Sequence, residues 1–196
     1  MQAHKWLSNS TEVLERIRVV SRASEVHIAS DGLPMMKTLG VTWLPGEDVF
    51  TFNANPPEKD FPLTKRNFLK NIAKLFDPVG FLAPFIIRAK ILLQGMWAAG
   101  MDWDDLFLAD IASKVRKWFK ELEDLPTIKV PRCLRLGQEE EMLSQTLHTF
   151  VDASQDAYVA VVYSRATFKS GAVSIRFVAA KSRVAPLQLQ AFLDWS

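Results

Sequence analysis

Apolar and polar positions in the first quarter of the chain alternate in short runs that favour strands. The runs KTLGVTWL and VFTFNA flank the turn residues 45–48, so residues 37–52 predict a β-hairpin. Before them, Asn9 stands three residues ahead of Glu12, a spacing typical of an N-cap and its capping-box partner. A short helix through Ile17 is therefore expected.

The middle of the chain changes to helical spacing. Thr64 predicts the N-cap of a helix that Asp77 and Pro78 end, and Pro84 fits the first turn of a second helix that stops near Gly100. These two helices are expected to pair as a hairpin. A third amphipathic helix, which closes before Pro126, is marked by apolar residues at helical spacing: Ile111, Val115, Trp118, Phe119 and Leu122.

The last third of the chain favours strands again. Residues 127–145 mix prolines, charges and short apolar runs, which indicates a connector with one edge strand. The runs TLHTFVDA, AYVAVVYS and SIRFVAAKS then predict a three-stranded meander, and the segment after Pro186 looks like the opening of a helix. The whole pattern predicts an α+β protein with a boundary near residue 145.

Composition narrows the class of protein. The 196 residues carry 24 Lys and Arg against 22 Asp and Glu, so the net charge of +2 permits contact with phosphates without demanding it. A single Cys133 excludes an internal disulfide, and polar residues interrupt the apolar stretch 81–99 too often for a membrane span. The N-terminus lacks the apolar core of a signal peptide. An intracellular protein, cytoplasmic or nuclear, is expected.

Several long segments carry a resemblance to a known family. The segment KRNFLKNIAKLFDPVGFLAPFIIRAKILLQGMW with the following MDWDD, and the shorter HKWLSNS, LGVTW, TFVDASQDAYVAVVYS and AAKSRVAPL, resemble the Pol polyprotein of Pao/BEL LTR retrotransposons, in that family's order. The resemblance implies that residues 1–145 are the C-terminal region of a reverse transcriptase, with a primer-grip hairpin and a thumb and connection-like part. It implies that residues 146–196 are an incomplete ribonuclease H-like domain with a mixed sheet.

The resemblance also implies what chemistry to look for. Ribonuclease H activity uses two Mg²⁺ ions held by several carboxylates, and Asp152 matches the first of these. The position of the expected acidic partner holds Gln188, and a neutral amide brings no charge to offset two dications. We therefore expect no catalysis by this chain alone and read Asp152 as an acid that caps the turn after its strand. A residual metal-dependent ribonuclease H is the less favoured alternative.

Basic residues offer a second candidate site. Positively charged side chains at Lys65, Arg66, Lys70 and Lys74 give the first long helix a basic side that fits the phosphates of an RNA–DNA or DNA duplex, although an ordinary solvated face explains them equally well. Five tryptophans could stack on bases, namely Trp6, Trp43, Trp97, Trp103 and Trp118. Four of these five are expected to be buried between elements. An incomplete sheet would also leave an exposed edge for a protein partner.

The name Pao retrotransposon peptidase is also attached to this region, and it raises the question of aspartic peptidase activity. Such an enzyme needs an Asp followed by Ser or Thr and then Gly, supplied twice. Residues 152–154 read Asp-Ala-Ser, without that glycine and without a second copy in the chain. Peptidase activity is therefore a matter of the family label and does not follow from the residues.

Overall fold

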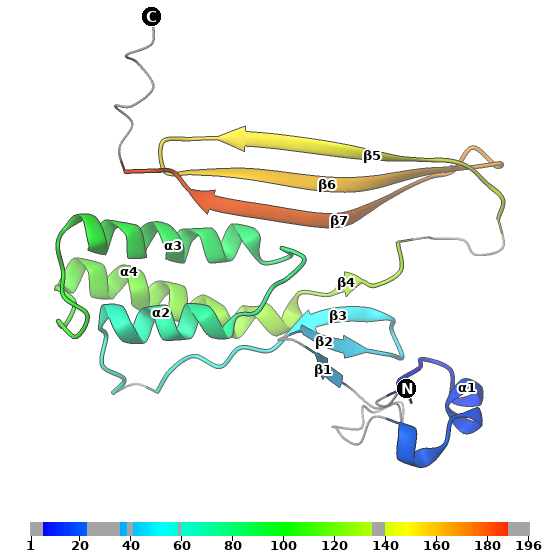
Figure 1. Cartoon of the computed structure of the whole chain (residues 1–196), viewed down its shortest axis with the longest axis horizontal. Coiled ribbons are helices and arrows are strands. Elements are labelled where there is room, and N and C mark those ends of the chain that lie inside the picture. The colour runs from blue at the N-terminus through cyan, green and yellow to red at the C-terminus, as the bar shows by residue number, and fades with distance from the viewer. Residues whose placement is uncertain (1–5, 23–35, 39–40, 59, 135–139, 188–196) are drawn as a thin grey trace, which may run out of the picture. The chain divides into compact units, whose positions relative to one another are not determined.

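The structure is a computed structural model that describes residues 6–22, 36–38, 41–58, 60–134 and 140–187 (Figure 1). Contacts divide the chain into two compact units: Met1–Asn55 with Glu123–Cys133, and Pro56–Leu122 with Leu134–Ser196. The helices and the second sheet share one unit, so these units do not follow the division at residue 145. That division concerns the origin of the sequence and stays a prediction.

The first unit begins with the short helix α1 (Thr11–Arg16). Its N-cap is Ser10, whose hydroxyl accepts from the Val13 N–H, and the prediction that Asn9 is the cap was wrong by one residue. A single turn of 3₁₀ helix, η1 (Val19–Ser21), follows.

The sheet of the first unit has the order β1-β2-β3-β4 and is antiparallel: β1 (Met36–Thr38), β2 (Val41–Leu44), β3 (Val49–Phe52) and β4 (Val130–Pro131). The predicted hairpin is confirmed as β2 and β3, but the run before its turn forms two strands and not one. Strand β4 is the edge strand expected in the connector. It is tied to the hairpin turn because Arg132 pairs with Asp48, whose carboxylate also accepts from the Trp43 indole.

The second unit contains the three predicted helices: α2 (Lys65–Lys74), α3 (Ala83–Ala98) and α4 (Ala109–Lys120). Thr64 caps α2, and Pro84 lies in the first turn of α3, as the sequence predicted. Helix α4 ends before Pro126, as the sequence predicted. A 3₁₀ segment, η2 (Glu121–Thr127), follows it and contains this proline. No helix among the described residues is long and apolar enough to cross a membrane.

Aromatic rings fill the space between these helices. Phe68 of α2 meets Trp118 and Phe119 of α4 edge to face, and Trp118 stacks on Phe85 of α3 at 4.8 Å between ring centroids. The Trp118 indole N–H also donates to the Phe85 carbonyl oxygen at 3.2 Å. Trp118 is 1% exposed, whereas Trp6, Trp97 and Trp103 are 39–49% exposed, so the expectation that four of the five tryptophans are buried was wrong.

The second sheet of this unit is the predicted three-stranded meander. It consists of β5 (Met142–Ala153), β6 (Ala157–Phe168) and β7 (Val173–Val184) in that order. The α+β class is confirmed. All described strand pairs of this sheet are antiparallel, so the parallel pair that a mixed sheet requires is absent from the described residues. The helix expected after Pro186 lies outside them.

Helix α3 and the turn before it lie against β7. The Asp77 carboxylate accepts from the N–H groups of Gly80, Phe81 and Leu82, which fixes the turn between α2 and α3. The Val79 carbonyl in this turn accepts from the Ala180 N–H of β7 at 2.8 Å. The turn therefore occupies part of one edge of the sheet.

Candidate nucleic-acid interface and the Asp152 pocket

The four cations predicted on α2 do not form one surface. Lys65 is 4% exposed, and its ammonium group donates to the Met101 carbonyl oxygen and lies over the rings of Trp97 and Trp103, at 5.9 and 5.0 Å from their centroids. Lys65 is three residues before the buried Phe68 and seven before the buried Ile72, so helical spacing already placed it on the packed face. It is not available to phosphates.

Arg66 is exposed but paired. Its guanidinium donates two hydrogen bonds to the Asp104 carboxylate, at 2.8 and 3.0 Å. These bonds raise the pKa of Arg66 and lower the pKa of Asp104. Of the other acids before α4, Asp105 accepts a hydrogen bond from the Asp102 N–H.

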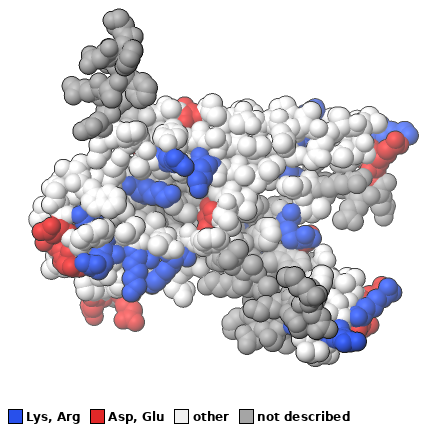
Figure 2. Space-filling model, viewed as in Figure 1, with Lys and Arg blue, Asp and Glu red and all other residues white. Residues whose placement is uncertain are grey.

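Lys70 and Lys74 are the remaining exposed cations of α2, and neither forms an ion pair among the described residues. With Arg66 they stand four residues apart and so form one stripe along the helix. Figure 2 shows Lys and Arg side chains gathered over α2, with acidic side chains beside them at its outer end. The basic side expected on α2 is thus reduced to a paired guanidinium and two ammonium groups without a carboxylate partner among the described residues, of which Lys74 donates to Asn71 Oδ1 at 3.4 Å.

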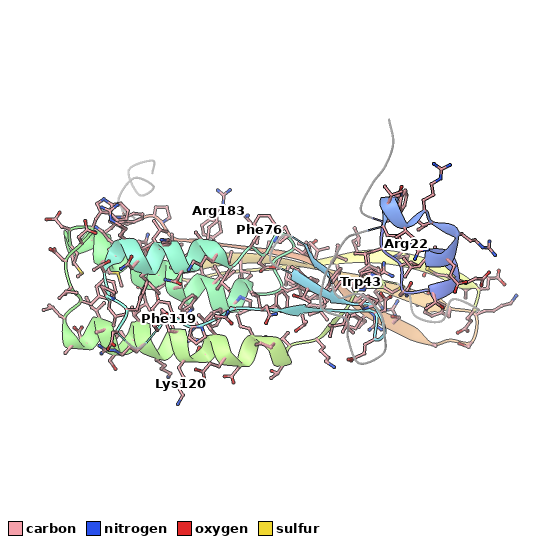
Figure 3. The ribbon with its side chains drawn as sticks, turned by 90° about the horizontal axis from the view of Figure 1, so that it is seen from below. Arg22, Trp43, Phe76, Phe119, Lys120 and Arg183 are labelled. Atoms are coloured by element: carbon pink, nitrogen blue, oxygen red, sulfur yellow. The ribbon has the colours of Figure 1, made fainter. Side chains whose placement is uncertain are left out.

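Helix α4 carries a larger basic face, which the sequence reading missed. Its exposed cations are Lys114, Arg116, Lys117 and Lys120, none of which forms an ion pair among the described residues. The face lies opposite the buried Val115, Trp118 and Phe119. Figure 3 shows Phe119 directed among the helices and Lys120 directed away from them. The alternation of cations with the apolar residues of this helix was the signal that could have revealed it.

Asp152 lies next to the last residue of β5, as expected. It stands opposite Val159 of β6, which stands opposite Ser182 of β7, and residues opposite one another in antiparallel strands share a face of the sheet. Ser182 Oγ donates to the Ala83 carbonyl oxygen at 3.5 Å. The side chain of Asp152 is therefore on the face of the sheet that meets the start of α3.

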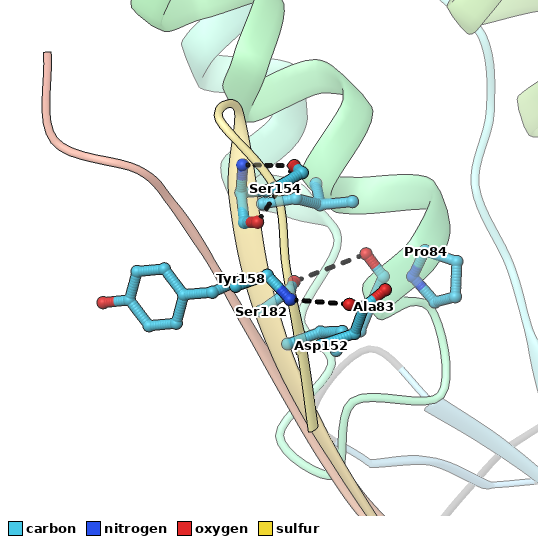
Figure 4. Close-up of a pocket in the computed structure, with 10 residues that line it drawn as sticks. Ala83, Pro84, Asp152, Ser154, Tyr158 and Ser182 are labelled. Carbon is cyan, nitrogen blue, oxygen red and sulfur yellow. Dashed lines mark hydrogen bonds between the residues drawn. The ribbon is translucent and has the colours of Figure 1, made fainter. Parts of the chain in front are cut away.

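A pocket of about 330 Å³ opens at this place, shown in Figure 4. Its polar groups come from Asp152, Ser154 and Ser182, and its apolar wall from the first turn of α3, chiefly Ala83, Pro84 and Ile87. The Asp152 carboxylate is exposed and accepts one hydrogen bond, at 2.9 Å from the N–H of Ala153.

The turn after β5 is held by Ser154 and not by Asp152. Ser154 Oγ accepts from the N–H groups of Asp156 and Ala157, each at 3.2 Å, and donates to the Ala157 carbonyl oxygen. The expectation that Asp152 caps this turn was therefore wrong. The Asp152 carboxylate accepts from the Ala153 N–H and points into the pocket.

Two divalent metal ions would need several carboxylates or comparable oxygen ligands around them. Asp152 is the single carboxylate of the pocket, and no group of three or more His, Cys, Asp and Glu residues that could hold a metal occurs in the described part of the chain. Gln188, which stands where the resemblance puts the acidic partner, lies outside that part. The described residues around Asp152 do not fit a two-metal centre.

Comparison with known proteins adds the family. No curated protein matches this chain. The family model described as Pao retrotransposon-like RNaseH-like domain matches residues 64–192, which is more than half of the chain and runs from the N-cap of α2 past β7. That description names a ribonuclease H-like domain and no peptidase. The chain therefore belongs to the Pao retrotransposon-like ribonuclease H-like family and derives from the Pol protein of a Pao retrotransposon.

Proposed function

We propose that this chain is a noncatalytic remnant of a Pao/BEL Pol polyprotein that binds RNA–DNA or DNA duplexes weakly through α2. The observation that carries the proposal is the stripe of Arg66, Lys70 and Lys74, in which both ammonium groups are exposed and free of carboxylates among the described residues. Lys and Arg side chains along a helix contact backbone phosphates without reading sequence. With only two unpaired cations in the stripe, the affinity is weak.

The noncatalytic part of the proposal is supported by the Asp152 pocket. One exposed carboxylate cannot offset the charge of two Mg²⁺ ions, and the hydroxyls of Ser154 and Ser182 bring no negative charge. We assign helices α2 to α4 and the first sheet to the reverse transcriptase side of the polyprotein, because their sequence segments resemble that region of Pao/BEL Pol.

The test is binding of a fluorescently labelled RNA–DNA hybrid by anisotropy at several salt concentrations. Exchanging both lysines, in the double variant Lys70→Glu and Lys74→Glu, should abolish measurable binding, whereas Lys90→Glu, an exposed cation of α3, should leave it within twofold. In milder form, Lys70→Gln with Lys74→Gln should reduce the salt slope by about 1.8, because each phosphate contact contributes about 0.9. Unchanged binding by both double variants would overturn the role of α2.

Catalysis is tested in the same titration with Mg²⁺ or Mn²⁺ present. We expect the hybrid to remain intact with the wild-type chain and with Asp152→Asn. Cleavage by the wild type that Asp152→Asn abolishes would show a surviving metal site and would overturn the noncatalytic assignment in favour of a residual ribonuclease H.

A second candidate function, a protein-interaction module, is favoured by one observation. Every residue of β5 is exposed, and β5 is the outer strand of its sheet, so its outer edge can accept a strand from a protein partner. Pairing at a sheet edge changes little with salt, whereas duplex binding weakens steeply. A partner retained at high salt, together with loss of hybrid binding, would favour this second function.

A further inference from the structure

The sheet β5-β6-β7 has a second face at the Asp152 end, turned away from α3. Successive residues of a strand point to opposite faces. The row Ala153, Tyr158 and Arg183 and the row Val151, Ala160 and Lys181 flank the Asp152 row on either side, so their side chains lie on this opposite face. Figure 4 shows Tyr158 directed away from Asp152, Ser182 and Pro84.

This face is hollowed at that end by about 490 Å³. Small side chains form its floor, namely Val151, Ala153 and Ala160, and larger ones stand around it, namely Tyr158, Lys181 and Arg183. Asp152 also lines the hollow, but its carboxylate belongs to the other face of the sheet. The hollow therefore combines apolar side chains with an aromatic ring and two cations.

The charged and aromatic groups are accessible. Tyr158 is 44% exposed, and Lys181 and Arg183 are exposed and form no ion pair among the described residues. Lys181 and Arg183 stand two residues apart on the same face of β7, which separates their backbones by about 7 Å. Figure 3 shows Arg183 projecting from the ribbon, and Figure 2 shows Lys and Arg side chains over the end of β7.

We infer that this hollow binds single-stranded nucleic acid, with an unpaired base stacked on Tyr158 and the adjoining phosphates held by Lys181 and Arg183. An exposed aromatic ring on a sheet, beside cations that follow the backbone, is the arrangement by which proteins bind single strands. A duplex keeps its bases stacked on one another, so it offers no face to Tyr158. This site uses no residue of α2, so the inference is independent of the proposed duplex binding.

The test is anisotropy with a labelled ten-nucleotide oligothymidylate, whose bases neither pair nor stack strongly on each other. Tyr158→Leu should weaken binding about tenfold, in the range measured for loss of one stacked base, while Tyr158→Phe keeps the ring and should stay within twofold. Lys181→Gln with Arg183→Gln should lower the salt slope by about 1.4, because each single-strand phosphate contact contributes about 0.7. Lys169→Gln, which removes one cation at the far end of β6, should change neither value.

Each outcome of these binding measurements either supports or overturns the inference. Lys70→Glu with Lys74→Glu should spare oligothymidylate binding, so failure of the α2 proposal and failure of this one are told apart. No binding by the wild type, equal binding by Tyr158→Leu, or loss in Tyr158→Phe as large as in Tyr158→Leu would each overturn the inference. Competition by a blunt duplex or by thymidine monophosphate at the same concentration as the oligonucleotide would overturn the choice of a single strand. Matching melting temperatures show that the variants are folded.

Discussion

The two edges of the second sheet are built in opposite ways. At the β7 edge, the Ala180 N–H donates to Val79, and Gly80 lies so close that a Cβ there would be 2.0 Å from the Ala180 carbonyl oxygen. Gln94 of α3 donates to the Ala185 carbonyl oxygen just beyond the strand. At the β5 edge, by contrast, all residues from Met142 to Ala153 are exposed. One edge is closed by the chain itself and the other is open.

The difference shows where the sheet is protected and where it is vulnerable. The closed edge depends on a short turn, DPVG at residues 77–80, that sits between two helices and so is positioned by them. The open edge has no such neighbour among the described residues, and it exposes large apolar side chains, including Leu147 at 68% and Val151 at 74%. Open apolar edges invite pairing with other chains. We expect β5 to control association and the turn to control stability.

The largest effect on stability is expected from adding a side chain at Gly80. Gly80 has φ of +88°, and a methyl group there would overlap the Ala180 carbonyl. Gly80→Ala should lower the free energy of unfolding by about 3 kcal/mol, since a left-handed backbone costs about 1–2 kcal/mol and overpacking adds about 1–3 kcal/mol. Urea denaturation measures this loss.

Gly171→Ala is the matched control for that substitution. Gly171 has nearly the same φ of +87°, but nothing lies within 4 Å of its hypothetical Cβ. It should lose only the backbone cost of about 1–2 kcal/mol. Equal losses at Gly80 and Gly171 would mean that contact with β7 contributes nothing to the stability of the sheet.

The next effect concerns the carboxylate that shapes the turn. Asp77→Ala removes the acceptor for three backbone N–H groups and should cost about 2 kcal/mol, the penalty of leaving partly buried donors unsatisfied. Amide exchange at Ala180 should become faster, because its acceptor Val79 is in the same turn. Asp77→Asn keeps one acceptor oxygen and should fall between the wild type and Asp77→Ala. Unchanged amide exchange at Ala180 would mean that the hydrogen bond between Ala180 and Val79 does not depend on the Asp77 carboxylate.

A smaller effect on stability but a visible one on association is expected at the open edge. Leu147→Lys places a charge on exposed β5 and should change the free energy of unfolding by less than about 0.5 kcal/mol. Light scattering of concentrated protein should nevertheless fall, because an edge lysine disfavours strand pairing. Leu134→Lys adds the same charge at a 45% exposed position outside the sheet. If Leu134→Lys reduces scattering equally, net charge and not the edge is responsible.

Local signals made most elements predictable from the sequence. Thr64 and Pro84 mark helix starts because their effect depends on neighbouring residues, and the β-rich runs after residue 145 gave the meander. The closed edge was not predictable in this way. Asp77 and Pro78 predicted the end of a helix, and α2 ends slightly earlier, at Lys74. The hydrogen bond between Val79 and Ala180, by contrast, joins residues 101 positions apart. No local pattern encodes that contact.

In the candidate sites, too, the features with a local signal were predictable and those that depend on packing or strand register were not. The position of Asp152 at a strand end followed from the sequence, whereas its single backbone partner and the role of Ser154 in the turn depended on the exact register. The prediction that Lys65 contacts phosphates was wrong because it rested on the charge of the residue and not on its position on the helix. Lys65 stands three residues before the buried Phe68 and therefore on the packed face. The hollow at Tyr158 depends on the register of three strands, and the sequence predicted these strands as a meander without fixing their register.

The smallest effect tests the layer of helices that holds the closed edge. Arg88 of α3 donates to the Glu121 carboxylate at 2.5 and 3.0 Å, and this hydrogen bonding lowers the pKa of Glu121 despite the opposing effect of burial. A carboxyl whose pKa is lower in the folded state stabilises the protein above its unfolded pKa of about 4.3 and loses that contribution as the pH falls through the folded value. Because Arg88 is 50% exposed, solvent screening limits the contribution to about 0.5 kcal/mol.

Glu121→Gln should therefore destabilise the protein by about 0.5 kcal/mol at pH 7 and should match the wild type at an acid pH below the lowered pKa of Glu121, where the wild-type carboxyl is protonated. Denaturation at the two pH values measures the difference. Glu58→Gln, which removes an exposed carboxyl that forms no ion pair among the described residues, is the control for the loss of one carboxylate charge. An equal loss for Glu121→Gln at both pH values would mean that packing of the Glu121 side chain, and not its charge, joins α3 to the end of α4. In that case the junction between α3 and the end of α4 would depend on side-chain packing, and acid would not weaken it through this ion pair.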